Sequence, residues 1–507
     1  MSLARIYSRA QVGIVAPEVI VEVHLGNGLP SFSIVGLPET SVKEAKDRVR
    51  SALINSQFSF PDQRITVNLA PADLPKEGGR FDLAIAIGIL VASEQLHCPD
   101  ISQYEFFGEL ALSGEIRGVS AIVPSVMAAT QAKRCCVLAQ VDDPLASLID
   151  SANRKACVSL QQVWLDLSGQ MPLALNCTYQ ADLTEQPDTC ADAFDLNEVK
   201  GQQQGKRALE IAAAGQHNLL FVGPPGTGKS MLAQRMTSIM PPMTADEALE
   251  TAALYSITGQ AIALNNWRKR PYRNPHHTCS AVALVGGSSN PRPGEISLAH
   301  NGILFLDELP EFERKVLDSL REPMETGKVV ISRAARQAEF PANFQLIAAL
   351  NPSPTGCHTD KRSTPDQVLK YLSKISGPFL DRIDLQVELP RLPASQLQSQ
   401  ECSESSEDVR IRVEKAYELQ MKRQGKLNSQ LSNKEIAMYC RLGIAEQAFL
   451  AQVSEKLGLS PRSYHRIIKV ARTIADLSEL PDITLTHLKE SIGYRALERL
   501  LNQLSQY

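Results

Sequence analysis

The sequence lacks the paired cysteines that mark small metal-bound or disulfide-bonded proteins. Its 507 residues include 10 cysteines, but no two of them form a C-x-x-C pair. They are scattered through a chain that is far too large to need a disulfide framework. We therefore expect reduced thiols, as in a cytoplasmic protein.

Long hydrophobic runs are also missing. The longest, LAIAIGILVA at residues 83–92, is closed by Asp82 and Glu94 and falls well short of the roughly 20 apolar residues of a membrane span. The first residues, MSLARIYSRAQVG, contain no apolar segment of the signal-peptide type. These absences predict a soluble, cytoplasmic protein without a membrane partner.

An excess of positive charge is absent as well. The formal net charge is -4, so the molecule as a whole produces no field that would attract nucleic acid. Any nucleic-acid partner must therefore be held by a local basic patch or a pore.

The length and the hydrophobic fraction of 43% are sufficient for several domains with their own cores. Two polar segments, 166–195 and 393–408, interrupt the apolar patterns and are predicted to be linkers. They leave domains at 1–165, 196–392 and 409–507. The last has apolar residues at three- and four-residue spacing, which predicts helices.

The middle segment contains a phosphate-binding loop. NLLFV (218–222) has the pattern of a strand, GPPGTGKS (223–230) follows at once, and MLAQRMTSIM then continues with helical spacing. The glycines allow backbone N–H groups to turn toward phosphates, Lys229 adds a cation, and the Ser230 hydroxyl can bind Mg²⁺. The alternative is a plain Gly-rich turn. The residues predicted to bind ATP are Gly223, Pro224, Pro225, Gly226, Thr227, Gly228, Lys229 and Ser230.

A second motif can hold the metal and the attacking water. NGILFLDELPEF (301–312) reads as a buried strand that ends in Asp307, placed to support Mg²⁺, and Glu308, placed to polarise water. A third strand, FQLIAAL, ends in Asn351, whose amide can lie between water and the γ-phosphate. A solvated acidic turn and a turn-forming asparagine before a proline are the structural alternatives.

The order of these motifs resembles the magnesium-chelatase-like branch of the AAA+ ATPases over nearly the whole chain. The segments that carry the resemblance, besides the phosphate loop, are NPHHTCSAVALVGG (274–287), PGEISLAHNGILFLDELPEF (293–312), FPANFQLIAALNPSPTG (340–356), SGPFLDRIDL (376–385) and SPRSYHRIIKVARTIADL (460–477).

The resemblance implies a P-loop α/β core with a parallel sheet and a helical lid over the nucleotide. It gives Asn351 the sensor-1 role, Arg382 the role of an arginine finger and Arg462 that of sensor 2, with Arg466 one turn further on as a rival. A helix residue that faces solvent is the alternative for Arg462.

An arginine supplied by a neighbouring subunit increases the rate of phosphoryl transfer by roughly 10³–10⁵. If Arg382 has this role, hydrolysis requires a ring, because no single subunit contains a complete site. The alternative for Arg382 is a surface ion pair with Asp381 or Asp384.

The resemblance also implies a function. We expect a hexameric ATPase that uses ATP and Mg²⁺ to move along DNA and to promote branch migration of recombination intermediates during natural transformation. Its expected partners are single-stranded and branched DNA, further copies of the chain, and recombination proteins. A motor subunit that inserts metal into a porphyrin and an ATP-dependent protein-remodelling factor are the rival functions.

Two basic stretches are candidates for DNA contact. GKVVISRAARQAEFPANF (327–344) reads as a hairpin that would project Lys328, Arg333 and Arg336 toward the pore of a ring. RKRPYR (268–273) is the second candidate. A charged, solvated surface is the alternative for either stretch.

The histidines and cysteines give little support to a structural metal site. His276 and His277 are adjacent, so we favour packing or nucleotide-coupled contacts over zinc. NPSPTGCH leaves only Cys357 and His358 after Asn351, which are too few for a structural zinc site.

Residues 1 to about 165 resemble the Lon-type (S5-type) proteolytic α/β domain. RITVNLAPADLPKEGG and FFGELALSGEIRGVSAI carry this resemblance. Arg80 occupies the position of the serine nucleophile and Val123 that of the lysine base, and neither can perform that chemistry. We therefore expect an inactive protease fold, in which Arg80 and Lys76 contact phosphate or Arg80 pairs with Asp82.

Overall fold

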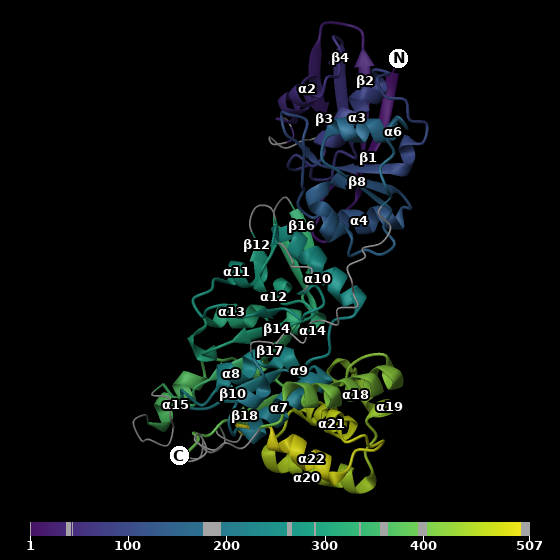
Figure 1. Cartoon of the computed structure of the whole chain (residues 1–507). Helices are drawn as coiled ribbons and strands as arrows, with labels where there is room; N and C mark the ends of the chain where they lie inside the picture. Colours follow the sequence, from purple (N-terminus) through teal and green to yellow (C-terminus); the bar gives the residue numbers. More distant parts are fainter. Residues whose placement is uncertain are drawn as a thin grey trace.

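The computed structural model describes residues 2–36, 42, 44–175, 194–260, 266–287, 291–333, 336–354, 364–393 and 403–497. In these ranges the chain forms two α/β parts followed by a helical part, as Figure 1 shows. The α/β class predicted from the sequence is confirmed. Within the same ranges no helix combines the length and the apolar character needed to cross a membrane. Most of both predicted linkers lies outside the described residues.

The N-terminal domain contains a mixed seven-stranded sheet of order β3-β4-β2-β1-β5-β8-β9. Buried and partly exposed residues alternate along β2, which is the pattern of a strand with one face on a core. The strands of the domain are β1 (Ser2–Arg9), β2 (Glu18–Gly26), β3 (Ser31–Val35), β4 (Arg64–Ala70), β5 (Tyr104–Phe107), β6 (Glu109–Leu110), β7 (Ile116–Arg117), β8 (Cys135–Ala139) and β9 (Arg154–Cys157). Its helices are α2 (Ala45–Asn55), α3 (Asp82–Ala92), α4 (Ile122–Gln131), α5 (Asp143–Ala146) and α6 (Leu160–Leu167).

Helix α3 is the longest apolar segment of the sequence. All its residues except Val91 are buried, so it is a core helix. A Cβ atom at Gly88 would lie 2.5 Å from Cγ2 of Val23 in β2. The helix therefore packs against the sheet more closely than any side chain at this position would permit.

The middle domain contains a parallel sheet of order β11-β14-β17-β10-β18. Strands β10, β14 and β17 are fully buried, as expected for a parallel sheet covered on both faces. The strands of the domain are β10 (Leu219–Val222), β11 (Tyr272–Arg273), β12 (Gly286–Gly287), β13 (Arg292–Pro293), β14 (Ile303–Leu306), β15 (Lys328–Arg333), β16 (Arg336–Pro341), β17 (Gln345–Leu350) and β18 (Leu385–Glu388). Its helices are α7 (Gln203–Gly215), α8 (Lys229–Gln234), α9 (Met236–Ile239), α10 (Ala245–Thr258), α11 (Ala281–Val285), α12 (Glu295–Leu298), α13 (Arg314–Ser319), α14 (Pro323–Thr326), α15 (Pro365–Leu372) and α16 (Gly377–Leu380).

The C-terminal part is helical, as the apolar spacing predicts. Its helices are α18 (Ser406–Gln424), α19 (Asn433–Tyr439), α20 (Ile444–Leu457), α21 (Pro461–Leu477) and α22 (Leu485–Gly493). The Ser460 hydroxyl accepts a hydrogen bond from the Ser463 amide at 3.1 Å and caps α21. Buried residues of α18 and α21 join the same hydrophobic cluster as α7, which attaches the helical part to the middle domain.

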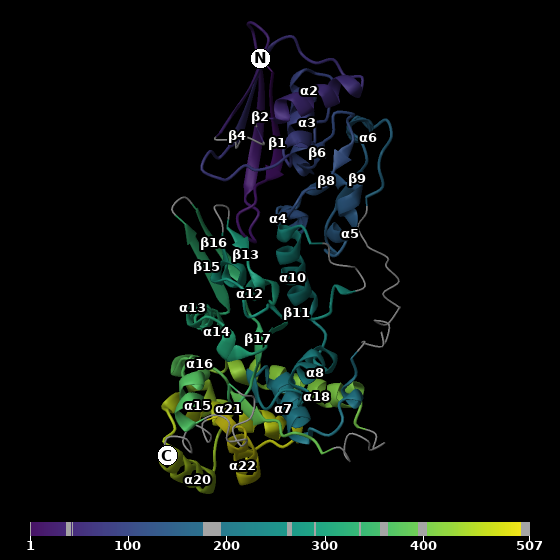
Figure 2. The same ribbon diagram turned by 90° about the vertical axis from the view of Figure 1, so that its left-hand side faces the viewer.

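Among the described residues, the N-terminal and middle domains contact each other where α4 lies above α10 in Figure 2, and buried residues of these two helices share one hydrophobic cluster. The Ala121 amide, next to α4, donates a hydrogen bond of 2.9 Å to the Ser256 carbonyl in α10. A Cβ at Gly13, between β1 and β2, would lie 3.2 Å from the Glu339 carbonyl oxygen of β16. The N-terminal domain thus contacts both α10 and the β15–β16 hairpin.

Candidate nucleotide-binding site

The loop between β10 and α8 has the backbone geometry that a phosphate loop requires. A Cβ at Gly223 would lie 2.5 Å from the Leu389 carbonyl oxygen, so only glycine fits there. Gly226 and Gly228 have φ angles of 79° and 88°, a left-handed region that glycine adopts without strain. The predicted order of strand, loop and helix is confirmed.

Lys229 lies inside the loop, where it is 8% exposed. Its Nζ atom donates hydrogen bonds to the carbonyls of Gly223 at 2.7 Å and Pro224 at 3.0 Å and to Oδ1 of Asn351 at 3.1 Å. Burial lowers the pKa of Lys229, and the charges of Asp307 and Glu308 oppose this shift. The structure therefore brings the predicted sensor-1 asparagine into contact with the predicted phosphate-binding lysine.

Ser230 and Asp307 meet because β10 and β14 both end at the same edge of the parallel sheet, with β17 between them. The Ser230 hydroxyl donates to Oδ2 of Asp307 at 2.7 Å. Hydroxyl and carboxylate oxygens are ligands that Mg²⁺ prefers, and this ion is usually completed by water and phosphate oxygens. The pair fits a Mg²⁺ ion bound together with a nucleotide.

Glu308 has a contact that the sequence does not reveal. It follows β14 with a φ of 52°, and its carboxylate Oε2 lies 3.4 Å from Nδ1 of His277. The His276 and His277 rings are 4.1 Å apart, and the His276 Nδ1 atom lies 2.9 Å from the Thr278 hydroxyl. The only sequence signal for this contact is that His277 closely follows β11, the strand beside β14.

The two histidines form no zinc site within the described ranges, where no three His, Cys, Asp or Glu residues are grouped to hold a metal. His277 contacts Glu308 and lies with its ring centroid 6.4 Å from that of Phe312, while the preference for packing or a nucleotide-coupled contact over zinc stays a prediction. Cys357 and His358 lie outside the described residues.

Arg382 lies at the opposite edge of the sheet from Lys229. It precedes β18, and its carbonyl accepts a hydrogen bond of 3.0 Å from Asn218, the residue before β10. Its guanidinium donates to Oε1 of Glu325 at 2.6 Å and to the Arg321 carbonyl at 3.1 Å. The alternative expected from the sequence was an ion pair with Asp381 or Asp384. This is wrong, because the ion pair of Arg382 is with Glu325.

Arg462 and Arg466 lie near Arg382 instead of beside Lys229. Burial lowers the pKa of Arg382, Glu325 opposes the shift, and the charges of Arg462 and Arg466 add to it. Arg466 lies 3.5 Å from Asp384, whereas Arg462 is exposed in the first turn of α21. The helical lid over the nucleotide therefore stays a prediction, and α21 packs near the other edge of the sheet, beside Asp384.

The predicted basic hairpin is present as the antiparallel pair β15–β16. Lys328 begins β15 and forms an ion pair of 2.7 Å with Glu339, so it lies at the base of the hairpin. Arg333 and Arg336 face each other in register at its far end, and their side chains lie outside the described ones. The structure thus separates Lys328 from the two arginines.

Two arginines of the second basic stretch, residues 268–273, make contacts within the protein. Arg270 donates to the carbonyls of Pro241 at 2.7 Å and Asn301 at 2.8 Å. Arg273 makes a bidentate ion pair with Glu295 at 2.6 and 2.8 Å. These contacts occupy both arginines, whereas Arg268 and Lys269 of the same stretch are exposed, so a DNA contact there stays a prediction for those two residues.

In the N-terminal domain Arg80 and Lys76 have different hydrogen-bond partners. Arg80 is buried and donates to the Ser120 carbonyl at 2.6 Å, whereas buried Lys76 donates to the Pro71 carbonyl. Asp82 pairs with Arg48 at 2.7 Å, so the expected Arg80–Asp82 pair is wrong. Val123, which the sequence comparison predicts to replace a protease lysine, is fully buried in α4.

Three protein-family descriptions match the chain: "Magnesium chelatase, subunit ChlI" over residues 195–397, "Subunit ChlI of Mg-chelatase" over 21–142 and "Magnesium chelatase, subunit ChlI C-terminal" over 403–495. The competence protein ComM of Haemophilus influenzae is 54% identical over 510 residues, with both chains covered completely. YifB of Escherichia coli is 49% identical over 100% of this chain and 99% of its own. The magnesium-chelatase 38 kDa subunit of Cereibacter sphaeroides is 26% identical over 31% of this chain and 53% of its own.

Proposed function

Because the chain belongs to the family of magnesium-chelatase-like AAA+ proteins that contains ComM and YifB, we propose that it is an ATP-hydrolysing motor that moves along DNA. The observation that carries this proposal is the meeting of Lys229, Ser230, Asp307 and Asn351 at one edge of the parallel sheet. These are the groups that phosphoryl transfer from a nucleotide requires.

Each residue of the site has a distinct task. The N–H groups of the loop and the Lys229 ammonium bind the phosphates of ATP. Ser230 and Asp307 hold Mg²⁺, which supplies positive charge against the phosphates when it is bound. Glu308 polarises the attacking water, and Asn351 orients that water beside the γ-phosphate.

The position of Arg382 supports a ring of subunits. Its guanidinium lies at the edge of the sheet opposite Lys229, so the phosphates that it serves belong to a neighbouring chain. A closed ring gives every subunit such a neighbour. We assign this ring as a hexamer, Arg382 as its arginine finger, and Arg462, with Arg466 as the rival, as a sensor-2 residue that also acts on a neighbour.

DNA is the substrate of the motor in this proposal. In this proposal the channel of the ring is lined by Arg333 and Arg336, at the end of the β15–β16 hairpin. They contact the phosphates of DNA without sequence-specific contacts to its bases. The name of the competence protein ComM supports a role in natural transformation, in which the motor promotes branch migration of recombination intermediates. It works in the cytoplasm on single-stranded and branched DNA, beside recombination proteins.

ATP turnover measured with and without single-stranded DNA, over a series of salt concentrations, tests the proposal. The Glu308→Gln variant is the blank, since it retains the site but lacks the carboxylate that polarises water. We expect DNA to stimulate turnover and salt to remove the stimulation. ATP turnover that is the same with and without DNA would support an ATPase but contradict the DNA motor. Metal insertion or protein remodelling would then be the functions to test.

A further inference from the structure

A second site lies in the N-terminal domain, outside the nucleotide-binding residues. It is a cavity of about 240 Å³, lined by residues 77–80 before α3, residues 118–120 before α4, Glu109 and Gln11. A Cβ at Gly79 would lie 2.6 Å from Oε2 of Glu109. Glycine at this position therefore lets the Glu109 carboxylate approach the segment that carries Arg80.

Arg80 supplies a fixed cation to this cavity. Its side chain is 5% exposed, and its Nη2 atom donates to the Ser120 carbonyl. Its Nη1 atom is buried and has no hydrogen-bond partner within the described part of the chain. A buried charged donor without an acceptor is costly, so the cavity favours a ligand that brings an acceptor oxygen.

The charges around Arg80 leave it protonated at neutral pH. Burial lowers the pKa of Arg80 to about 10, and Glu77 and Asp142 oppose this shift. Burial also raises the pKa of Asp142 to about 6, while the Val119 amide and Arg80 favour its charged form. Arg80 therefore remains a cation that can bind an anion.

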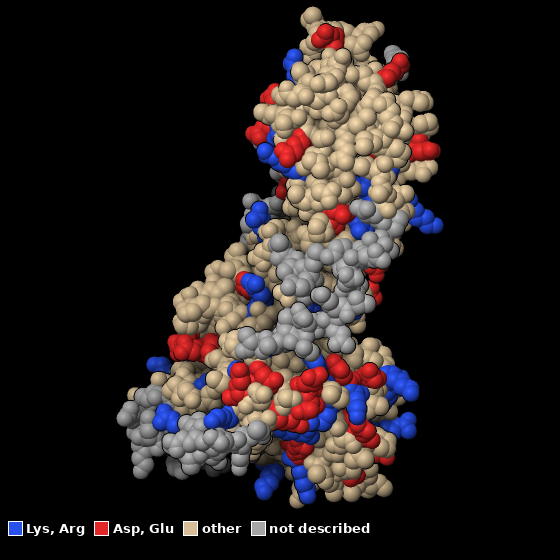
Figure 3. Space-filling view, viewed as in Figure 1, with Lys and Arg blue, Asp and Glu red and all other residues tan. Residues whose placement is uncertain are grey.

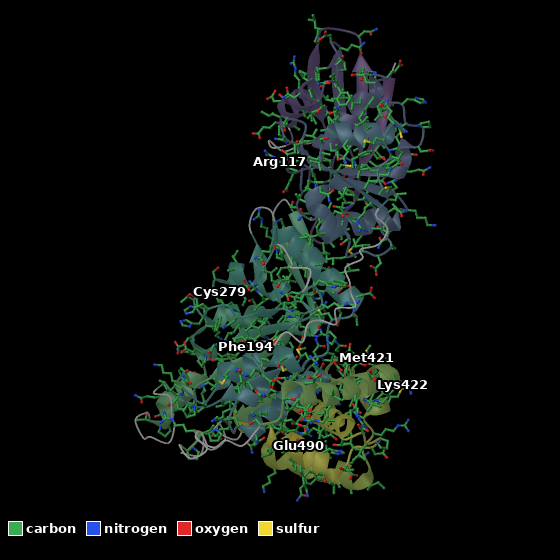
Figure 4. All side chains as sticks on the ribbon, in the orientation of Figure 1. Arg117, Phe194, Cys279, Met421, Lys422 and Glu490 are labelled. Carbon is green, nitrogen blue, oxygen red and sulfur yellow. The ribbon has the colours of Figure 1, made fainter. Side chains whose placement is uncertain are left out.

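Glu109 adds an acceptor at the same cavity. Its side chain is 36% exposed and lies 3.9 Å from Arg117, which Figure 4 labels on the N-terminal domain. The cavity therefore combines a buried donor with two carboxylates, those of Glu77 and Glu109. A fully deprotonated anion would satisfy Arg80 but would be repelled by both carboxylates.

We propose that this cavity binds a phosphate group that carries a proton, with inorganic hydrogen phosphate as its simplest form. The phosphate oxygens accept from the Arg80 guanidinium, and the remaining O–H group donates to the Glu109 carboxylate. Sulfate and the phosphodiesters of a DNA backbone have no proton to donate near neutral pH, so they bind less well. This site is separate from the proposed ATPase function and does not depend on it.

The cavity also lies close to two of the contacts that join the domains. Gln11 lines it, and Gly13 lies against the Glu339 carbonyl of the hairpin. Ser120 lines its other side, and the next amide, that of Ala121, bonds to α10. A bound phosphate therefore lies beside both of these connections to the middle domain.

Calorimetric titration of the full chain with inorganic phosphate tests this site, in a Lys229→Ala background that weakens phosphate binding at the nucleotide loop. We expect Arg80→Gln to lower the affinity by more than about ten-fold, because a charge-assisted hydrogen bond is lost. Arg64→Gln is the matched control, since Arg64 is exposed in β4 and does not line the cavity. An unchanged affinity in Arg80→Gln would overturn the proposal.

Sulfate provides an independent test if Arg80→Gln does not fold. We expect sulfate to bind about ten-fold more weakly than phosphate, and Glu109→Gln to reduce this difference, because the neutral amide no longer repels an unprotonated anion. Sulfate binding as tight as phosphate binding in the presence of Glu109 would contradict the proposed role of the proton.

Competition by short oligonucleotides separates the two sources of phosphate. Displacement of inorganic phosphate by a 5′-phosphorylated strand, but not by its 5′-hydroxyl counterpart, assigns the site to a DNA end. No displacement by either strand assigns it to free phosphate, and both results support the site. Equal displacement by both strands would overturn the proposal, because a phosphodiester would then be sufficient.

Discussion

Among single residues, Arg382 allows the sharpest test of the ring. It lies far from the phosphate loop of its own chain and pairs with Glu325. We expect Arg382→Ala to retain ATP binding but to lose turnover by roughly 10³-fold, because the charge supplied to the neighbouring site is gone. Nucleotide-binding and turnover assays on the same preparation measure the two effects separately.

Glu325→Gln is the control for this variant. It removes the ion pair of Arg382 but leaves the guanidinium available, so it should retain most of the turnover. Mixing Arg382→Ala subunits with Glu308→Gln subunits should restore part of the activity, since some interfaces then combine an intact arginine with an intact glutamate. Equal losses in Arg382→Ala and Glu325→Gln would assign Arg382 a structural role within its own subunit.

His277 is a second residue with a specific prediction. Its ring nitrogen lies 3.4 Å from the Glu308 carboxylate, so His277→Ala should leave this carboxylate poorly positioned. We expect turnover to fall by about ten-fold with little change in nucleotide binding. His276→Ala is the matched control, because His276 contacts Thr278. Similar turnover in the two variants would argue against a positioning role for His277.

At the scale of elements, the β15–β16 hairpin is the part that we expect to contact DNA. Replacing both Arg333 and Arg336 with alanine should weaken DNA binding and make the remaining binding less dependent on salt, because fewer counterions are released. DNA-binding titrations at several salt concentrations measure both quantities. Lys328→Ala should have a much smaller effect, since Lys328 pairs with Glu339 at the base of the hairpin.

The same experiment can contradict the assignment. ATP turnover without DNA should remain unchanged in the double variant, because the hairpin lies outside the nucleotide site. If Lys328→Ala and the double variant weaken binding equally, the hairpin end is not the contact.

The elements were largely predictable from the sequence because each predicted strand is a short apolar run that ends in a polar turn. Strands β10, β14 and β17 and the hairpin follow directly from such patterns. Contacts between distant segments were not predictable, because they depend on strand order and domain packing. Glu325 lies 57 positions from Arg382, and His277 reaches Glu308 only because β11 pairs with β14.

Over the whole molecule, the charges do not form a field of one sign. The net charge is -4, and on the face in Figure 3 basic and acidic side chains lie interspersed. Attraction of DNA must therefore arise from local arginines that a ring brings together, and screening by salt should weaken it strongly.

ATP-dependent movement of a branch point is the most direct test of the motor. A mobile four-strand DNA junction with labelled arms would be incubated with the wild-type protein and with the Glu308→Gln variant, each with ATP and Mg²⁺. We expect the wild-type protein to convert the junction to duplex products and the variant to bind it without conversion. Equal conversion by both proteins, or no conversion by the wild-type protein under conditions where DNA stimulates its ATP turnover, would contradict an ATP-driven branch-migration motor.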